Sequence, residues 1–276
     1  LISYRVMLNT YAAGSNKDKL TAIKNEMANG FSIRLSPAQF GEDNTVFSED
    51  AASGSIRDAL SSMPYMSRTL AEALAACPVP DTFTGFLLYA QANLPMDARQ
   101  TERLIRTGYF ARYGPSEALL ALFKEFRSGK LRITKALSEK SRAVRIPALM
   151  EMESRLIQDK PDALSECYRV ASAQAALTGS PSGVFPGTNA LDYAVISVPE
   201  RASGSYILYS LARGTSGPLR MKKDYAAALK LAPGVILRLV DYYPRPEMDY
   251  RGDKPKPIPG TKVWWIGCAQ VLMRAS

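Results

Sequence analysis

The chain has 276 residues, a formal net charge of +9 and no histidine. The absence of histidine excludes catalytic triads, imidazole general bases and histidine metal ligands. With 46% hydrophobic and 22% charged residues, the composition is that of a globular protein, and the length predicts two domains. No apolar run is long enough to cross a bilayer, so no membrane partner is expected. The three cysteines lie far apart without a CxxC spacing, which argues against a zinc site and favours a reducing, cytoplasmic location.

The first part of the chain predicts an α-helical domain over residues 1–178. Apolar residues at helical spacing mark its helices, which end at glycine or proline. Helices are expected over 1–11, 16–30, 67–76, 82–92, 145–156 and 161–177, with a further one through Ile56 and Leu60. A short strand is expected at 31–35, and a break with a helix cap at 14–16. Because the chain begins at Leu1 inside an apolar pattern, we expect it to be a piece of a longer protein.

The stretch 104–120 predicts two helices that are broken at glycines. Leu104 closes the first helix, and Gly108 follows where a left-handed residue is needed. Ser116 is suited to cap the second helix, after a glycine–proline break. Apolar residues at helical spacing then follow at Leu119, Leu122, Phe123 and Phe126. This pattern predicts that the second helix buries one face.

Basic residues cluster between residues 112 and 145, whereas the first hundred residues are slightly acidic. The candidates for contacts with nucleic-acid phosphates are Arg112, Lys124, Arg127, Lys130, Arg132, Lys135, Arg142 and Arg145. A clustered patch attracts a polyanion more strongly than scattered charge does. The alternative is a solvated helix face followed by a basic linker.

A segment rich in glycine, proline and serine at 179–187 predicts a linker, because these residues do not extend a helix. Beyond it, residues 188–276 show the alternating pattern of β-strands. Strands are expected at 193–198, 205–213, 219–222, 235–243 and 262–273, with a helix at 225–231. A proline-rich loop over 245–260 contains a predicted turn at 251–253. Three strands, a helix and two strands are the element order of an OB-fold, a small Greek-key barrel.

An OB-fold binds single strands by stacking bases on aromatic rings within a basic groove. The candidates for such contacts are Tyr206, Tyr209, Arg213, Arg220, Lys222, Lys223, Trp264 and Trp265. Alternation along a strand places Tyr206 and Tyr209 on opposite faces, and the same holds for the two tryptophans. We therefore expect one ring of each pair to belong to the core.

The order of these segments resembles the bacterial replicative DNA polymerases, namely the DNA polymerase III α subunits. The stretch LIRTGYFARYGPSEALLALF at 104–123 is similar to a segment of that family. Residues 4–47 resemble its fingers region, and SIRDALSSMPYMSRTLAEAL at 55–74 lies where the family has a helix–hairpin–helix. Residues 193–214, with the later WWI at 264–266, resemble its C-terminal OB-fold. The resemblance implies an α+β protein, in which an α-helical, helix–hairpin–helix-like domain precedes a five-stranded OB-like barrel.

By this resemblance, the chain is the DNA-binding, post-palm part of a polymerase III α-like subunit. Its role would be to hold duplex product and single-stranded template beside a catalytic palm that is not in this chain. The alternative is a non-catalytic protein-interaction module, replisomal or phage-derived, on the same scaffold. The first hairpin favours this alternative, because Pro64 stands where the family has the glycines that let a backbone approach a phosphate.

The three aspartates that hold two metal ions in the polymerase palm have no counterpart here, so no catalytic residue and no cofactor are assigned to the chain. Mg²⁺ is expected only at the palm, and we expect no primer extension by this chain alone. Besides DNA, the resemblance implies the rest of the polymerase as a partner. A sliding clamp is a further candidate partner, because Gln91–Met96 superficially resembles a clamp-binding peptide. A loop between helices with Leu94 buried is the alternative that we favour.

Overall fold

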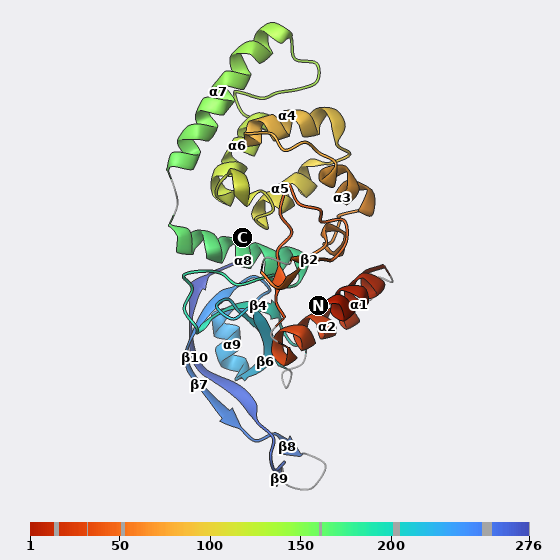
Figure 1. Cartoon of the computed structure of the whole chain (residues 1–276). Coiled ribbons are helices and arrows are strands. Elements are labelled where there is room, and N and C mark those ends of the chain that lie inside the picture. Colours follow the sequence, from red (N-terminus) through yellow and green to blue (C-terminus); the bar gives the residue numbers. More distant parts are fainter. Residues whose placement is uncertain are drawn as a thin grey trace. The chain divides into compact units, whose positions relative to one another are not determined.

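Helices dominate the first part of the chain and a closed β-barrel dominates the second (Figure 1). The computed structural model describes residues 1–13, 17–31, 33–50, 53–159, 162–200, 205–249 and 256–275. The predicted turns at 14–16 and 251–253 lie outside the described residues. The chain divides into two units, Leu1–Val170 and Ala171–Ser276. This division falls inside a helix, earlier in the chain than the predicted linker at 179–187.

The first unit combines helices with a small three-stranded sheet. Its helices are α1 (Ile2–Ala13), α2 (Lys17–Gly30), α3 (Arg68–Ala75), α4 (Phe83–Asn93), α5 (Ala98–Arg106), α6 (Ser116–Ser128) and α7 (Glu139–Gln158). Two 3-10 helices are η1 (Leu60–Ser62) and η2 (Ala111–Tyr113), and the strands are β1 (Leu35–Ser36), β2 (Ser48–Asp50) and β3 (Ser55–Arg57). The central strand β3 pairs in parallel with β1 and antiparallel with β2. Helix α8 (Ala163–Thr178) crosses the division between the units.

The helix predicted through Ile56 and Leu60 is wrong, because this segment forms β3 and η1. Ile56 pairs with Leu35 on one side and Glu49 on the other, and its side chain is fully buried. It packs in a small core with residues of α1 and α2, among them Leu8 and Met27. Long-range pairing therefore overrides the local helical pattern. The helix–hairpin–helix expected at 55–74 is not confirmed.

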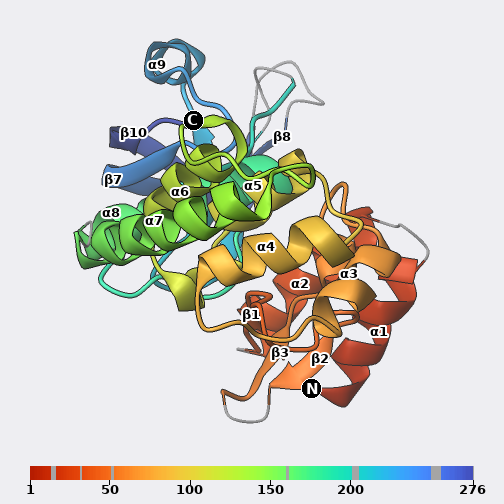
Figure 2. The ribbon, with the colours of Figure 1, turned by 90° about the horizontal axis from the view of Figure 1, so that it is seen from above.

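The main core of the first unit is built from α3 to α7. Its centre is an aromatic cluster in which the Phe86 ring lies 4.9 Å from Phe40 and 4.5 Å from Phe110. Figure 2 shows α6 and α7 running side by side, and residues of both helices belong to this core. The N-terminus of α4 is capped by the buried Glu153 carboxylate of α7, which accepts hydrogen bonds from the backbone N–H groups of Phe83 and Thr84 at 2.6 and 2.9 Å.

The predicted break after Leu104 is confirmed. Gly108 has φ +81°, and the N–H groups of Gly108 and Tyr109 donate to the carbonyls of Ile105 and Leu104. These two bonds form a Schellman motif, which satisfies the last carbonyls of α5. The surroundings also leave little room for a side chain at this position, since a Cβ atom there would lie 3.1 Å from a methyl group of Val170.

The prediction that Ser116 caps α6 is wrong. Pro115 occupies the N-cap position, and Ser116 is the first residue of the helix. The Ser116 N–H donates to a carboxylate oxygen of Glu166 at 2.7 Å. A carboxylate from a distant segment therefore supplies the negative charge that favours a helix N-terminus.

The second unit contains a closed five-stranded barrel. Its strands are β4 (Asp192–Ser197), β5 (Tyr206–Ser210), β6 (Thr215–Met221), β7 (Ile236–Arg245) and β10 (Val263–Met273). They close in the order β10-β6-β5-β4-β7, and β6 and β10 form the parallel pair. Helix α9 (Lys223–Leu229) lies between β6 and β7 in the sequence, and the short strands β8 (Met248–Asp249) and β9 (Lys256–Pro257) lie between β7 and β10. This arrangement is consistent with the OB-like barrel that the sequence predicts.

An ion pair with a buried carboxylate joins β4 to β7. Asp192 is fully buried, and its two carboxylate oxygens accept hydrogen bonds from the Arg238 guanidinium at 2.7 and 3.0 Å. The two residues are also opposite each other in the antiparallel register. This bidentate contact fixes the register of the barrel, so Arg238 has a structural role.

Candidate nucleic-acid interface

The basic segment of the first unit begins on α6 and continues into the loop 129–138. Buried Ile133 anchors this loop, and its N–H donates to the Phe126 carbonyl at 2.9 Å. Arg142 and Arg145 of α7 hold the loop from the other side, because their guanidinium groups donate to the carbonyls of Thr134 and Arg132 at 2.9 and 2.6 Å. These two predicted site residues thus position the loop and are half-buried.

The other cations of the segment are exposed. They are Lys124, Arg127, Lys130, Arg132 and Lys135. No carboxylate of the described residues lies within 4.0 Å of their charged nitrogens. Unpaired surface cations can contact phosphates without first breaking an ion pair. We call these five residues the basic set.

Arg112 differs from the basic set, although it was predicted with them. Its guanidinium lies against Gly41, and one nitrogen donates to the Phe40 carbonyl at 3.4 Å. The same group lies 5.8 Å from the Tyr113 ring centroid. Arg112 therefore connects two segments of the first unit.

The two tyrosines of β5 are both buried, although only one of them was expected to be. They do lie on opposite sides of the strand. Tyr206 packs in the barrel core, whereas the Tyr209 hydroxyl donates to the Gly183 carbonyl at 2.7 Å. Tyr209 is covered because the segment predicted as a linker packs on β5, where the Phe185 N–H donates to the Leu211 carbonyl. Buried rings offer no face on which a base could stack.

The burial of Tyr209 predicts that its hydroxyl contributes to stability and not to the binding of DNA. Tyr209→Phe should lower the free energy of unfolding by about 1 kcal/mol, because it removes one buried hydrogen bond and leaves the Gly183 carbonyl without its donor. The affinity for single-stranded DNA should not change. Thermal melting and oligonucleotide titration of the same sample measure both quantities. A variant that melts like the wild type but binds less tightly would show that the hydroxyl reaches the ligand.

Exposed aromatic rings are found on the hairpin of β7 and β10, which continues beyond the barrel towards β8 and β9 (Figure 1). Tyr242 and Trp264 are 43% and 42% exposed, and their ring centroids lie 5.5 Å apart. On the opposite face of the hairpin, the Arg245 guanidinium lies 4.9 Å from the Tyr243 ring and 5.4 Å from the Trp265 ring. We call these five residues the hairpin cluster.

Three members of the hairpin cluster, Tyr242, Tyr243 and Arg245, were not predicted as site residues. The predicted strand ended at Tyr243, whereas β7 continues to Arg245. The signal that could have found them is a pair of adjacent aromatic residues on each of two strands that the OB-fold order makes neighbours. The register, with Trp265 opposite Tyr243, is what brings them together.

The predicted cations of the barrel do not form one patch with a single role. Arg220 is opposite Trp265 in the parallel pair of β6 and β10, and its guanidinium lies 3.9 Å from a Glu247 carboxylate oxygen. Its buried Nε has no hydrogen-bond partner among the described residues. The other three predicted cations of the barrel are exposed, in a turn and at the start of α9: Arg213, Lys222 and Lys223. Arg220 is thus the predicted cation that lies beside the hairpin cluster.

The titratable groups show no activated nucleophile among those with resolved shifts. Burial raises the pKa of the Cys77 thiol, and burial together with nearby carboxylates raises that of Cys167. Burial also raises the pKa of Tyr113 to about 12. A thiol with a raised pKa is mostly protonated at neutral pH and therefore a poor nucleophile.

Two features are absent from the described residues. They do not bring three or more cysteine, aspartate or glutamate side chains together where a metal ion could bind. Within the same part of the chain, no helix has both the length and the apolar character needed to span a membrane.

The chain matches no protein-family model and no curated protein.

Proposed function

We propose that the chain binds nucleic acid as the post-palm part of a DNA polymerase III α-like subunit. In this role the barrel is an OB-fold that holds the single-stranded template, and the first unit contacts the duplex product. The catalytic palm, with its Mg²⁺ ions, belongs to another part of the polymerase. The observation that carries the proposal is the exposed pair of rings, Tyr242 and Trp264, on the hairpin of a closed barrel.

The position of the hairpin supports single-strand binding. OB-folds bind oligonucleotides on the face of their second and third strands together with the loops between strands one and two and between strands four and five. In this barrel β7 and β10 are the fourth and fifth strands, so the hairpin cluster lies on the strand ends that flank the second of these connections. Arg220, on the third strand, is opposite Trp265 in the register.

The chemistry of the cluster supports the same function. Aromatic rings stack on bases of any sequence because every base has a π face. Arg245 is held between two rings, which keeps its positive charge on the hairpin surface where a phosphate can approach. The hairpin therefore offers rings for stacking on one face and the Arg245 charge on the other, and we expect little sequence preference.

The basic set supports a second contact, with phosphates of a duplex. Its members lie on one helix and the loop that follows it, and the loop is held by Arg142 and Arg145. A fixed loop presents its cations without a large loss of backbone entropy on binding. Phosphate contacts carry no sequence information, so this contact is independent of base sequence.

The second candidate is the protein-interaction module. It is favoured by two observations in the first unit. β3 and η1 stand where the first helix of the expected helix–hairpin–helix would be, so the turn at Pro64 lacks the two-helix scaffold of a phosphate-binding hairpin. A pocket also opens between α4, α5 and α6.

One experiment decides between the two candidates. Single-stranded and primed duplex DNA are titrated into the whole chain at several salt concentrations, with fluorescence anisotropy as the readout. Nucleic-acid binding predicts affinity for both forms that falls steeply with salt. If the chain binds neither form at low salt, the nucleic-acid proposal fails and the interaction module replaces it.

A further inference from the structure

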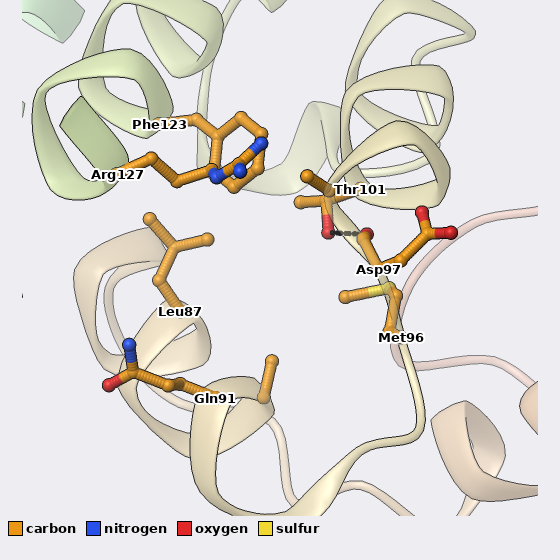
Figure 3. A pocket seen from close by; sticks show the side chains of 9 residues that line it. Leu87, Gln91, Met96, Asp97, Thr101, Phe123 and Arg127 are labelled. Carbon is orange, nitrogen blue, oxygen red and sulfur yellow. Dashed lines mark hydrogen bonds between the residues drawn. The ribbon is translucent and has the colours of Figure 1, made fainter. Parts of the chain in front are cut away.

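A pocket of about 210 Å³ lies in the first unit, where α4, α5 and α6 meet (Figure 3). Leu87 comes from α4, Met96 from the connection to α5, and Phe123 from α6. Their side chains form apolar walls, and Arg127 stands at one side with its guanidinium 5.8 Å from the Phe123 ring centroid. An apolar cavity of about 150 Å³ is enough to hold a benzene molecule, so this pocket has room for one large apolar side chain.

Apart from Arg127, the polar residues that line the pocket already make hydrogen bonds. The Thr101 hydroxyl donates to the Asp97 carbonyl at 2.8 Å, and the Gln91 amide donates to the Ile133 carbonyl at 3.0 Å. The Asp97 carboxylate caps α5 by accepting from the Gln100 N–H, and Figure 3 shows it pointing away from the pocket. The interior therefore offers apolar contact and few free hydrogen-bonding groups, which suits a hydrocarbon group better than a polar one.

The charged residues that line the pocket are Arg127 and Asp97, and the Asp97 carboxylate points away from it. Arg127 is exposed, and no carboxylate of the described residues lies within ion-pair distance of it. An unpaired cation beside an apolar pocket is complementary to an acidic residue that stands next to an apolar one.

We propose that this pocket docks an acidic peptide segment of a partner protein by taking up one of its large apolar side chains. An acidic residue beside that side chain pairs with Arg127. Docking is a function separate from the binding of single strands by the barrel, and either one can hold without the other. It also gives Gln91–Met96 a different role from that of a clamp-binding peptide, because Gln91 and Met96 line a receptor for a peptide.

A nucleic acid fits this pocket less well than a peptide does. Phosphate contacts need cations but no apolar cavity. Base stacking needs an open ring face, whereas Phe123 is only 8% exposed and Arg127 lies over it. The apolar volume is therefore explained by a side chain and not by a phosphate backbone.

The test uses the whole chain with its methionine methyl groups isotopically labelled and observed by NMR. The first probe is a short peptide with one central leucine flanked by aspartate and glutamate. The matched probe has serine in place of leucine, and a third probe is single-stranded oligothymidine. We expect the leucine peptide to shift the Met96 methyl resonance, with a Kd on the order of 0.1–1 mM. The serine peptide should bind at least about ten-fold more weakly.

Two variants and one control test the site itself. Ala98→Glu places a carboxylate on the pocket wall at the first position of α5, where a negative charge is compatible with the helix dipole. It should lower the affinity for the leucine peptide at least about ten-fold, because the new carboxylate repels the acidic residues of the peptide. Arg127→Gln removes the charge, keeps a polar side chain with the same Cβ–Cγ–Cδ stem, and should weaken binding about three-fold to five-fold. Lys124→Gln, on the same helix but outside the pocket lining, removes the same charge and should change the affinity less than about two-fold.

Three outcomes would overturn the proposal. One is an unmoved Met96 resonance with the leucine peptide at about 1 mM. Another is equal binding of the leucine and serine peptides, which would show an effect of charge alone. The last is a shift of Met96 by oligothymidine that Ala98→Glu abolishes, which would identify a nucleic acid as the occupant. Thermal melting of each variant confirms that the compared proteins are folded.

Discussion

Replacing Tyr242 and Trp264 together with alanine is expected to weaken binding of single-stranded DNA by about 2–6 kcal/mol, since each ring that stacks on a base contributes roughly 1–3 kcal/mol. The single changes should each cost about half of this. Both rings are more than 40% exposed, so the melting temperature should fall only slightly. Fluorescence anisotropy with a labelled oligothymidine at fixed salt measures the loss.

The control for this prediction is Tyr65→Ala. Tyr65 is 78% exposed, lies in the first unit, and packs on a cation, with the Arg103 guanidinium 4.7 Å from its ring centroid. Its loss should leave single-strand binding unchanged. Trp264→Phe keeps a ring in place and should retain most of the affinity. Normal binding by the double alanine variant would remove the hairpin cluster from the proposed site.

The strand content of the barrel could be predicted from the sequence because each strand carries its own local signal. Alternation identified five strands, and glycine and proline marked their ends. The position of the helix between the third and fourth strands followed in the same way, and the structure places α9 there. Gly108 was predictable for a similar reason, since a left-handed residue after a helix is a local requirement.

Features set by distant contacts could not be predicted. Ile56 reads locally as a helical residue, but its pairing with Leu35 and Glu49 makes it the middle of a strand. Ser116 reads as a cap, but Glu166 supplies the capping charge from fifty positions away. When a helix is capped by a carboxylate from a distant segment, the sequence near that helix carries no signal of the cap.

In the candidate site, too, features that depend on distant contacts could not be predicted from the sequence. The alternation of Tyr206 and Tyr209 was foreseen, but the covering of Tyr209 by the segment around Gly183 depends on tertiary packing. Trp264 was identified from its type, whereas its partner Tyr242 emerges only from the register of β7 and β10. In the basic segment, the sequence could not separate Arg142, which holds the loop, from its exposed neighbours.

Removing four charges from the basic set should weaken the binding of duplex DNA and reduce its dependence on salt. In this variant, alanine replaces four cations: Arg127, Lys130, Arg132 and Lys135. Each cation that pairs with a phosphate releases condensed counterions, so the slope of log K against log salt should decrease by about 0.9 for every such pair that the variant can no longer form. Affinity for the duplex should fall most at low salt and by the same factor for any base sequence, because phosphates carry no base information. Titrations of two unrelated duplexes over a salt series measure both effects.

A charge-matched control separates local contact from net charge. It replaces with alanine four exposed cations outside the basic set: Arg68, Arg99, Arg155 and Lys230. Both variants carry the same net charge, so a general loss of attraction would affect them equally. A smaller slope in the first variant alone assigns the phosphate contacts to the loop that Arg142 and Arg145 hold in place. Equal slopes in the two variants would mean that the duplex is attracted by overall charge, and the loop would then have no specific part in binding it.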